Sequence, residues 1–542
     1  MMPADEPRGE TMTSLLESVA LERPESPALR YGQELLSWRA FLDRTRRVAG
    51  GLAAAGLQAG DRLAVWLPTV PDYLALCFAA WRLGATVVSV NTRFNAAELE
   101  HVLRGLRPRM LAFWPGFADI DFPGILAAVP AELRADLRAV LLYQEDGGAA
   151  ALPAGLVTCP VRTVAQLAQA SPLRDDRASP DAECVTFTTS GTTRAPKFVL
   201  HRHRGVAHHA RDVASALGFD AADAVTLQTL PLCAVFGFAQ AIAAIAGGSP
   251  QIMLPRFDGG RAAALVREHR VTHCMGTDEL FQRMLAACPE VHAFPTLRVC
   301  GYVIFGAAAG PFREETVRRR LPLVGLFGMS EVLALFAVQR AADPPELRMR
   351  DGGFPVSPLA AVRARDLQNE EILPHGEVGM LEVRGPSVMT GYIDNHEATQ
   401  AAFTEDGFLR TGDLGSTCAD GSFLYFSRLG DVLRLGGFLV NPLEIEAHLE
   451  RHPDLVGAQV VGARGPRGDC AVAFVLMRDG ATYDEASLRA FCTGALAKYK
   501  MPDRFVPLHA FPVTRSGNGT KIQRHKLREL AQALYDTAGC GG

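Results

Sequence analysis

A run of hydroxyl-bearing residues near the middle of the chain is the stretch best suited to chemistry. Residues 188–197 are Thr-Thr-Ser-Gly-Thr-Thr-Arg-Ala-Pro-Lys, and they lie between two β-rich pieces, 184–187 and 198–200. Such a loop offers backbone N–H groups, hydroxyl donors and the mobile ammonium of Lys197 to a polyphosphate. It is not a Walker A loop, because Pro196 and Phe198 replace the second Gly and the Ser/Thr of that motif. The alternative is an ordinary Ser/Thr-rich turn. The residues expected to contact phosphate are Thr189, Ser190, Gly191, Thr192, Thr193 and Lys197.

Four further segments follow this loop along the chain. They are Phe327-Gly328-Met329-Ser330-Glu331, Thr411-Gly412-Asp413, Arg428 with Asp431, and Lys521 near the C-terminus. Together with the loop they resemble, in type and in order, the adenylate-forming superfamily, which contains AMP-forming acyl-CoA synthetases, luciferases and peptide-synthetase adenylation domains. The resemblance extends over roughly residues 38–528. It implies binding of ATP and AMP, of Mg²⁺ and of coenzyme A.

The resemblance also places the nucleotide. Small residues after the strand-like 303–305 would let the flat adenine lie against backbone, and Phe327 would supply an aromatic face. An ionised Asp413 can accept two ribose hydroxyls, and Arg428 would reach the same ribose. The alternatives are a loop packed only for structure and an Asp that stabilises a turn. The expected nucleotide residues are Gly306, Ala307, Ala308, Phe327, Gly328, Met329, Asp413 and Arg428.

Three residues are expected, from the same resemblance, to act on the reacting groups. Glu331 corresponds to the magnesium-side carboxylate, and hard Mg²⁺ prefers such oxygen ligands together with phosphate oxygens. Ser330 could donate to phosphate or carboxylate, and Lys521 could aim its ammonium at the carboxylate and the α-phosphate. Lys500 is a competing lysine, but its flanks match a different segment of the family. The expected reaction forms an acyl-adenylate from a carboxylic acid, which a thiol then attacks.

The segment 231–238 resembles the border of the carboxylic acid pocket. Many members have His where this chain has Ala234, so the pocket is expected to be roomier and less polar, suited to a bulky, apolar acid. The alternative is that Ala234 only repacks a core. The expected pocket residues are Ala234, Val235, Phe236, Gly237 and Phe305, with Met329 nearby.

Helix and strand patterns alternate in the first hundred residues and predict a parallel sheet with crossover helices. The predicted elements are a helix over 38–55, a strand over 62–67, a helix over 73–83, a strand over 85–90 and a helix over 96–103. Short strands with turns over 376–392 suggest a small β-barrel. The predicted fold is therefore a large N-terminal α/β domain with a small β-barrel, followed by a smaller α+β domain. The predicted bounds are 1–428 for the large domain, with the barrel near 350–428, 429–431 for a hinge and 432–542 for a mobile C-terminal domain.

The predicted hinge carries a glycine where relatives usually have Asp or Lys. Gly430 has the widest φ/ψ freedom, so a pivot is feasible but less biased toward either orientation. Arg434 stands where many members have Lys. The residues expected at the hinge and in the loop that approaches the site during thioester formation are Gly430, Arg434, Gly436, Gly437 and Phe438.

Two departures from the family lie in the phosphate loop, where Arg194 and Phe198 occupy positions that are commonly Gly. With Ala234 and Gly430, they suggest an enzyme in which adenylation is weak or lost and a supplied acyl-adenylate is thioesterified. The leading prediction is an acyl-CoA ligase. The same motifs also suit a stand-alone adenylation enzyme that loads a carrier protein, and an inactive paralogue that only binds nucleotide.

Composition indicates the compartment of the protein and the classes of ligand that it is not expected to bind. The chain has 542 residues and a net charge of −4, so nothing indicates nucleic acid. Its 11 cysteines include no CxxC pair, which suits a reducing cytoplasm. The N-terminus lacks an apolar signal core and the run 235–246 is too short to span a bilayer, so we expect a soluble, cytoplasmic protein, with a homodimer left open. Four histidines at 201, 203, 208 and 209 are expected on a solvated helix face rather than around a metal.

Overall fold

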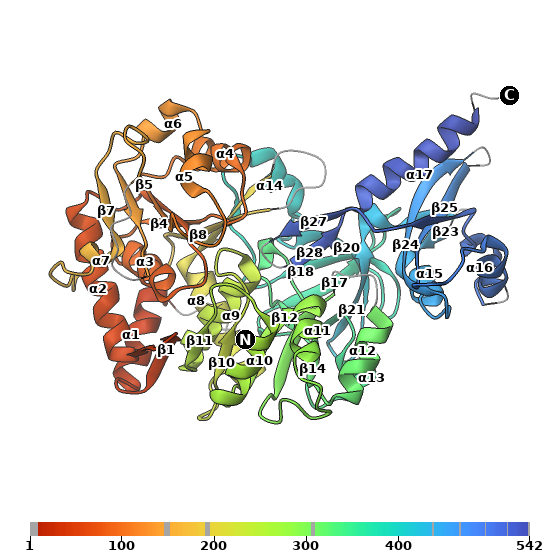
Figure 1. Ribbon diagram of the computed structural model, residues 1–542, viewed down its shortest axis with the longest axis horizontal. Coiled ribbons are helices and arrows are strands. Elements are labelled where there is room, and N and C mark those ends of the chain that lie inside the picture. Colours follow the sequence, from red (N-terminus) through yellow and green to blue (C-terminus); the bar gives the residue numbers. More distant parts are fainter. Residues whose placement is uncertain are drawn as a thin grey trace.

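The structure is a computed structural model, and it combines a large N-terminal part with a smaller C-terminal part (Figure 1). It describes residues 9–145, 152–189, 196–304, 309–435, 438–465, 468–493, 495–516 and 519–539. In Figure 1 the C-terminal elements, coloured blue, lie at one end of the molecule.

An eight-stranded sheet organises the first part of the chain, and most of its strands are parallel. Strands β8 and β9 form an antiparallel pair on either side of the phosphate loop, and β19 joins β9 from much later in the chain. In spatial order the strands are β19 (Gly391–Tyr392), β9 (Phe198–Arg202), β8 (Glu183–Thr188), β4 (Thr86–Ser89), β3 (Arg62–Trp66), β5 (Met110–Phe113), β6 (Ala139–Leu142) and β7 (Val161–Thr163).

The alternation predicted for the first hundred residues is confirmed. Helices α2 (Trp38–Ala54), α3 (Pro71–Arg82) and α4 (Ala96–Leu106) alternate with β3 and β4. Each helix begins at a recognisable signal: Ser37 and Asn95 cap α2 and α4, and Pro71 occupies the first turn of α3.

A second sheet of thirteen strands is parallel in its middle and antiparallel at its ends. In spatial order it contains β17 (Ala361–Arg365), β18 (Gly379–Arg384), β20 (Leu409–Thr417), β21 (Phe423–Arg428), β16 (Gly352–Pro355), β15 (Ala337–Val338), β14 (Leu323–Phe327), β13 (Val299–Val303), β12 (His273–Thr277), β10 (Thr226–Gln228), β11 (Gln251–Met253), β1 (Pro27–Tyr31) and β2 (Glu34–Ser37).

The predicted short strands near 350–428 are present, but in the described residues β17 pairs only with β18. They therefore extend the sheet as an open edge, and no closed barrel forms. Gly391–Tyr392, predicted among them, pairs instead with the eight-stranded sheet, because the chain crosses over after β18.

Five helices lie between the two sheets and share one apolar core with both. That core includes Leu63 and Val87 from the first sheet and Leu29 and Met253 from the second. The sandwiched helices are α1 (Met12–Glu22), α2, α3, α8 (His203–Leu217) and α9 (Val235–Gly247). The short helix α7 (Val164–Leu167) packs against α2 and adds Val164 and Leu167 to this core. On the outer faces lie α4, α5 (Phe122–Ala127), α6 (Ala131–Ala135), α10 (Gly259–Glu268), α11 (Asp278–Ala286), α12 (Ala309–Arg318), α13 (Pro345–Arg348) and α14 (His396–Ala402).

The C-terminal part has its own core around a three-stranded sheet, β24-β25-β26. Its elements are β22 (Leu433–Leu435), β23 (Phe438–Val440), α15 (Pro442–Leu449), β24 (Leu455–Gly465), β25 (Gly468–Met477), α16 (Glu485–Cys492), β26 (Arg504–Leu508), β27 (Val513–Ser516), β28 (Gly519–Ile522) and α17 (Arg524–Gly539), with a short 3₁₀ turn at Lys498–Lys500. In Figure 1 the hairpin β27–β28 reaches toward the N-terminal part, and β28 contacts α11 there.

A 3₁₀ turn, Leu429–Asp431, connects the two parts. Arg528 of α17 donates from Nη1 to the Gly430 carbonyl at 3.2 Å and to Asp431 Oδ1 at 2.6 Å. A Cβ added at Gly430 would meet open space, so the Asp or Lys expected from relatives would also fit in this conformation. The role of 429–431 as a hinge stays a prediction.

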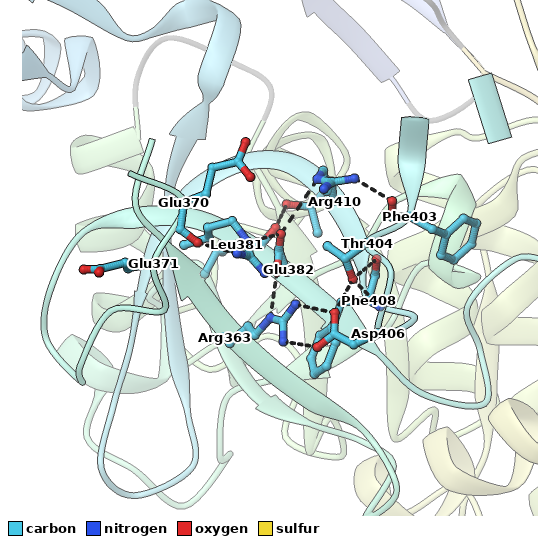
Figure 2. A network of polar contacts seen from close by, with 12 residues as sticks. Arg363, Glu370, Glu371, Leu381, Glu382, Phe403, Thr404, Asp406, Phe408 and Arg410 are labelled. Atoms are coloured by element: carbon cyan, nitrogen blue, oxygen red, sulfur yellow. Dashed lines mark hydrogen bonds and ion pairs between the residues drawn. The ribbon is translucent and has the colours of Figure 1, made fainter. Parts of the chain in front are cut away.

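A buried carboxylate fastens β17, β18 and β20 to one another (Figure 2). Glu382 on β18 is fully buried and accepts hydrogen bonds from Nε of Arg363 at 2.6 Å and Nε of Arg365 at 2.7 Å. Nε of Arg410 on β20 lies 3.9 Å away. Arg363 also binds both oxygens of Asp406, at 2.5 and 2.8 Å, which ties the loop before β20 to β17.

Replacing Glu382 with Ala is expected to lower the free energy of unfolding by about 3 kcal/mol, because Arg363 and Arg365 lose their common buried acceptor. Denaturant unfolding followed by circular dichroism measures this change. Glu405→Ala is the matched control, since Glu405 is exposed in the neighbouring loop, and it should change the unfolding midpoint little. Equal midpoints for the two variants would contradict a stabilising role for Glu382.

Candidate active site

Two hydrogen bonds join the ends of the phosphate loop, Thr189 and Lys197. The Thr189 N–H donates to the Lys197 carbonyl at 2.9 Å, and the Lys197 N–H donates to Thr189 Oγ1 at 3.2 Å. Residues 190–195 lie outside the described residues, so the predictions for the loop interior and for Arg194 are not addressed. The described ends of the loop are nevertheless held together at the edge of β8 and β9.

Phe198, the second departure from the family, points away from the Lys197 side of β9. Successive side chains of a strand face opposite sides, and the Phe198 ring is buried against α4. It stacks on His101 with centroids 4.8 Å apart, and His101 Nε2 donates to the Pro196 carbonyl at 2.7 Å. Gly105 leaves room for the ring, since a Cβ there would lie 2.4 Å from Phe198. The large ring thus anchors the loop stem rather than entering the phosphate side.

The turn that carries Ser330 and Glu331 follows β14 directly. His201 Nε2 donates to the Ser330 carbonyl at 2.8 Å, and the Met389 N–H donates to the Glu331 carbonyl at 2.8 Å. His209 Nε2, on α8, is hydrogen-bonded to the Leu333 carbonyl at 3.1 Å. Both the phosphate-loop strand and the helix after it therefore hold this turn in place.

The prediction of solvated histidines is wrong for three of the four. His201, His203 and His209 are buried, and burial lowers the pKa of each to about 4, so they are neutral at pH 7. His208 alone is half-buried and pairs with Asp212 at 3.2 Å. The sequence pattern missed that α8, which carries His203 and His209, is enclosed between two sheets, and that His201 lies on β9 against the Ser330 turn. In the described part of the chain, no group of three or more His, Cys, Asp or Glu side chains could hold a metal.

Tyr392, which the sequence did not single out as functional, joins two predicted site residues. The Lys197 ammonium lies 4.0 Å from the centroid of the Tyr392 ring, and the Tyr392 hydroxyl donates to Glu331 Oε1 at 2.9 Å. Glu331 is 8 % exposed. A single carboxylate of this kind fits an ion that takes its other ligands from phosphate and water, as Mg²⁺ does in nucleotide sites.

Asp413 lies on β20 directly across from Arg428 on β21. The carboxylate is 2 % exposed, and Arg428 Nε lies 3.1 Å from Oδ1 at an angle that leaves this oxygen without a hydrogen bond. Burial raises the pKa of Asp413 to about 6, against the lowering effect of the Arg428 guanidinium, and the charge of Glu331 adds to the rise. A buried acceptor that lacks a donor is costly unless a ligand supplies one. The site therefore fits the hydroxyls of a ribose.

An aromatic group lies next to this pair. Phe327 packs edge-on against Phe423, with centroids 5.1 Å apart, and lies 5.8 Å from Tyr425. Burial and the charge of Asp413 raise the pKa of Tyr425, which places its hydroxyl in the same polar surroundings. Tyr425 is a second residue that the sequence did not single out. Its position on β21, three residues before Arg428, was the only available signal.

The segment predicted to border the acid pocket begins helix α9. Ala234 is the N-cap residue and is half-buried, as is Val235, whereas Phe236 is buried in an apolar cluster with Met275 and Leu335. Gly237 has no room for a side chain, because a Cβ would lie 2.3 Å from the Pro231 carbonyl oxygen. The glycine is thus required by close packing at this turn.

Gly328 and Met329 connect β14 to the Ser330 turn, and a Cβ at Gly328 would lie 2.5 Å from the Ala334 backbone. The other predicted residues fall in two groups. Phe305, Gly306, Ala307, Ala308, Gly436 and Gly437 lie outside the described residues. Arg434 belongs to β22, Phe438 to β23 and Lys521 to β28. Lys500, the competing lysine, donates to both oxygens of Glu444 at 2.7 Å, so its ammonium already has a partner.

Comparisons with known proteins identify the family of the chain. Residues 16–393 match the AMP-binding enzyme family, and residues 444–518 match the AMP-binding enzyme C-terminal domain. A sulfoacetate–CoA ligase from Cupriavidus necator is 30% identical over 96% of this chain and 97% of its own. Pyochelin synthase PchD from Pseudomonas aeruginosa is 32% identical over 95% of this chain and 91% of its own. The crystal structure of ATP-bound MatB from Rhodopseudomonas palustris superimposes with a TM-score of 0.83 at 25% identity, covering 97% of this chain and all of MatB.

The two-part architecture and the two family matches, which together cover most of the chain, identify an adenylate-forming enzyme. The chain belongs to the AMP-binding enzyme family. None of its described helices combines the length and apolar character that a membrane span requires.

Proposed function

We propose that this enzyme activates a carboxylic acid with ATP and transfers the acyl group to coenzyme A, with release of pyrophosphate and AMP. The observation that carries the proposal is the buried Asp413 carboxylate, whose Oδ1 forms an ion pair with Arg428 but accepts no hydrogen bond. The sulfoacetate–CoA ligase that resembles the chain over nearly its full length supports CoA as the acceptor.

The acid's carboxylate attacks the α-phosphorus, the acyl-adenylate forms, and pyrophosphate leaves. Two anions approach in this step, so fixed positive charge and oriented donors lower its barrier. In this chain Lys197 and the hydroxyls of the phosphate loop would hold the phosphates, and Lys521 would stabilise the developing charge. Mg²⁺ held beside Glu331 would neutralise phosphate charge.

The second half-reaction needs different surroundings, because the thiol of coenzyme A must reach the carbonyl carbon before AMP leaves. A small domain that rotates at 429–431 would exchange the Lys521 hairpin for the segment 434–438. Arg528 fastens the downstream side of this turn and the Asp413–Arg428 pairing fastens the upstream side, which leaves Leu429 and Gly430 as the pivot.

The acid is proposed to be bulky and apolar, because Ala234 stands where many relatives carry the larger and more polar His. A panel of acids incubated with ATP, Mg²⁺ and CoA, followed by mass detection of AMP and thioester, tests both the function and this preference. Thioester formation with aryl or medium-chain acids exceeding that with acetate is expected. Faster turnover of acetate or sulfoacetate would overturn the roomy pocket, and AMP without any thioester would overturn CoA as the acceptor.

A carrier-protein acceptor is the second candidate, because the same sequence motifs suit an adenylation enzyme that loads a carrier protein. Acylation of a phosphopantetheinylated carrier protein faster than of free CoA would establish it. ATP–pyrophosphate exchange tests whether adenylation itself is intact. Robust exchange is expected, because Phe198 points away from the phosphate side. Light scattering in solution tests whether the protein forms a homodimer, which the sequence leaves open.

A further inference from the structure

Tyr392 lies between a cation and an anion that would otherwise attract each other. Its ring contacts the Lys197 ammonium on one side, at 4.0 Å from the centroid, and its hydroxyl donates to Glu331 at 2.9 Å. Within the described ranges Lys197 forms no ion pair with a carboxylate, and Glu331 binds no basic side chain. The positive charge of Lys197 therefore lies over the Tyr392 ring, and the negative charge of Glu331 lies at the Tyr392 hydroxyl.

The backbone around Tyr392 is tied to both of the elements that carry these charges. Tyr392 pairs with Val199 of β9, and the Ile393 N–H donates to the Phe198 carbonyl at 2.9 Å. The Met389 N–H donates to the Glu331 carbonyl at 2.8 Å. The Tyr392 N–H donates to Thr399 Oγ1 at 2.9 Å, which anchors the short strand to α14. The phenol is therefore held in place independently of the two side chains that it touches.

A direct Lys197–Glu331 ion pair would neutralise both groups before any ligand arrives. A ring face attracts an ammonium more weakly than a carboxylate does, so Lys197 remains free to bind phosphate. A hydrogen bond to one oxygen of Glu331 orients the carboxylate and leaves the other oxygen for a metal ion.

We propose that Tyr392 is a positioning residue, which separates Lys197 from Glu331 and so preserves one charge for the phosphates of ATP and the other for the metal. This inference rests on the proposed function. Two variants divide the roles: Tyr392→Phe keeps the ring under Lys197 but frees Glu331, and Tyr392→Leu releases both.

The test is direct binding of a non-hydrolysable ATP analogue with Mn²⁺, measured by calorimetry and by electron paramagnetic resonance of the ion. Tyr392→Phe should weaken Mn²⁺ binding in the ternary complex about 10-fold, with little change in metal-free nucleotide affinity. Tyr392→Leu should weaken both, the metal-free affinity by about 3- to 30-fold, because Lys197 can then pair with Glu331. In the ligase assay the Mg²⁺ concentration for half-maximal rate should rise in parallel.

Tyr483→Phe is the matched control, since Tyr483 is half-buried in the small domain and donates to the Phe505 carbonyl at 2.7 Å. It should bind nucleotide and metal as the wild type does. Wild-type levels of metal and nucleotide binding in both Tyr392 variants would overturn the positioning role and leave the proposed function intact. A wild-type protein that binds no analogue would overturn both. If Tyr392→Leu fails to fold, the Tyr392→Phe result decides, because that variant removes a single oxygen.

Discussion

Replacing Asp413 with Asn is expected to weaken ATP binding at least about 100-fold while leaving the protein folded. An ionised carboxylate can accept from two ribose hydroxyls, and each hydrogen bond to a charged group contributes about 1.5–3 kcal/mol. Asn offers one weaker acceptor in the same space and introduces donors opposite Arg428. Loss of binding measured by calorimetry, with kcat recovered only at high ATP, is the expected signature.

The same substitution is expected to raise stability at neutral pH. The folded-state pKa of Asp413, about 6, lies above its unfolded value of 3.8, so the charged form costs stability above pH 6, by up to about 3 kcal/mol. As the pH falls from 6 toward 4, Asp413 becomes protonated in the folded protein before it does in the unfolded chain. The destabilisation therefore disappears over this range. The difference in Tm between Asp413→Asn and the wild type should therefore be positive at pH 7.5 and vanish near pH 4.

Asp420→Asn provides a control for this pH dependence. Asp420 is exposed in the turn after β20, and hydrogen bonds from Ser422 lower its pKa, so neutralising it should bring no gain in Tm at pH 7.5. Unchanged ATP affinity in Asp413→Asn would contradict the ribose role. If the Tm of Asp413→Asn, relative to that of the wild type, is lower at pH 7.5 than at pH 5, the destabilisation assigned to the buried carboxylate is contradicted.

Local patterns were sufficient for elements whose capping and burial are encoded in contiguous residues. The helices α2, α3 and α4 and the strands β3 and β4 were predicted because each carries its own period and its own end signals. The proximity of Asp413 and Arg428 was anticipated by the family resemblance, and it follows physically from the antiparallel pairing of β20 and β21.

Features that depend on distant pairings could not be predicted in this way. Tyr392 contacts Lys197 only because a two-residue strand pairs with β9, nearly two hundred residues earlier in the chain. The burial of His201, on β9, and of His209, on α8, depends on contacts with the turn after β14, which comes far later in the chain. The open edge at β17 depends on pairings that periodicity does not encode. The direction of the Phe198 ring could have been inferred from strand alternation, since Lys197 precedes it directly.

Lys521→Ala is expected to reduce the adenylation rate by about 10²–10³, the usual effect of removing one donor from a charged transition state. The backbone already supports this role. Lys521 pairs with Thr514 in the hairpin β27–β28, and β28 contacts α11, which begins directly after the carboxyl end of β12. Carboxyl ends of parallel strands form the edge at which ligands bind in such sheets, and α11, which the hairpin contacts, begins at that edge.

The two half-reactions separate this role from general damage to the site. ATP–pyrophosphate exchange should fall with Lys521→Ala, whereas thioester formation from a supplied acyl-adenylate should stay within a few-fold of the wild-type rate. Lys500→Ala is the matched control: Lys500 is already paired with Glu444, so both rates should remain nearly unchanged. Equal losses in both half-reactions would assign Lys521 to nucleotide binding or domain packing. Normal exchange in Lys521→Ala, with a loss in Lys500→Ala, would transfer the catalytic role to the other lysine.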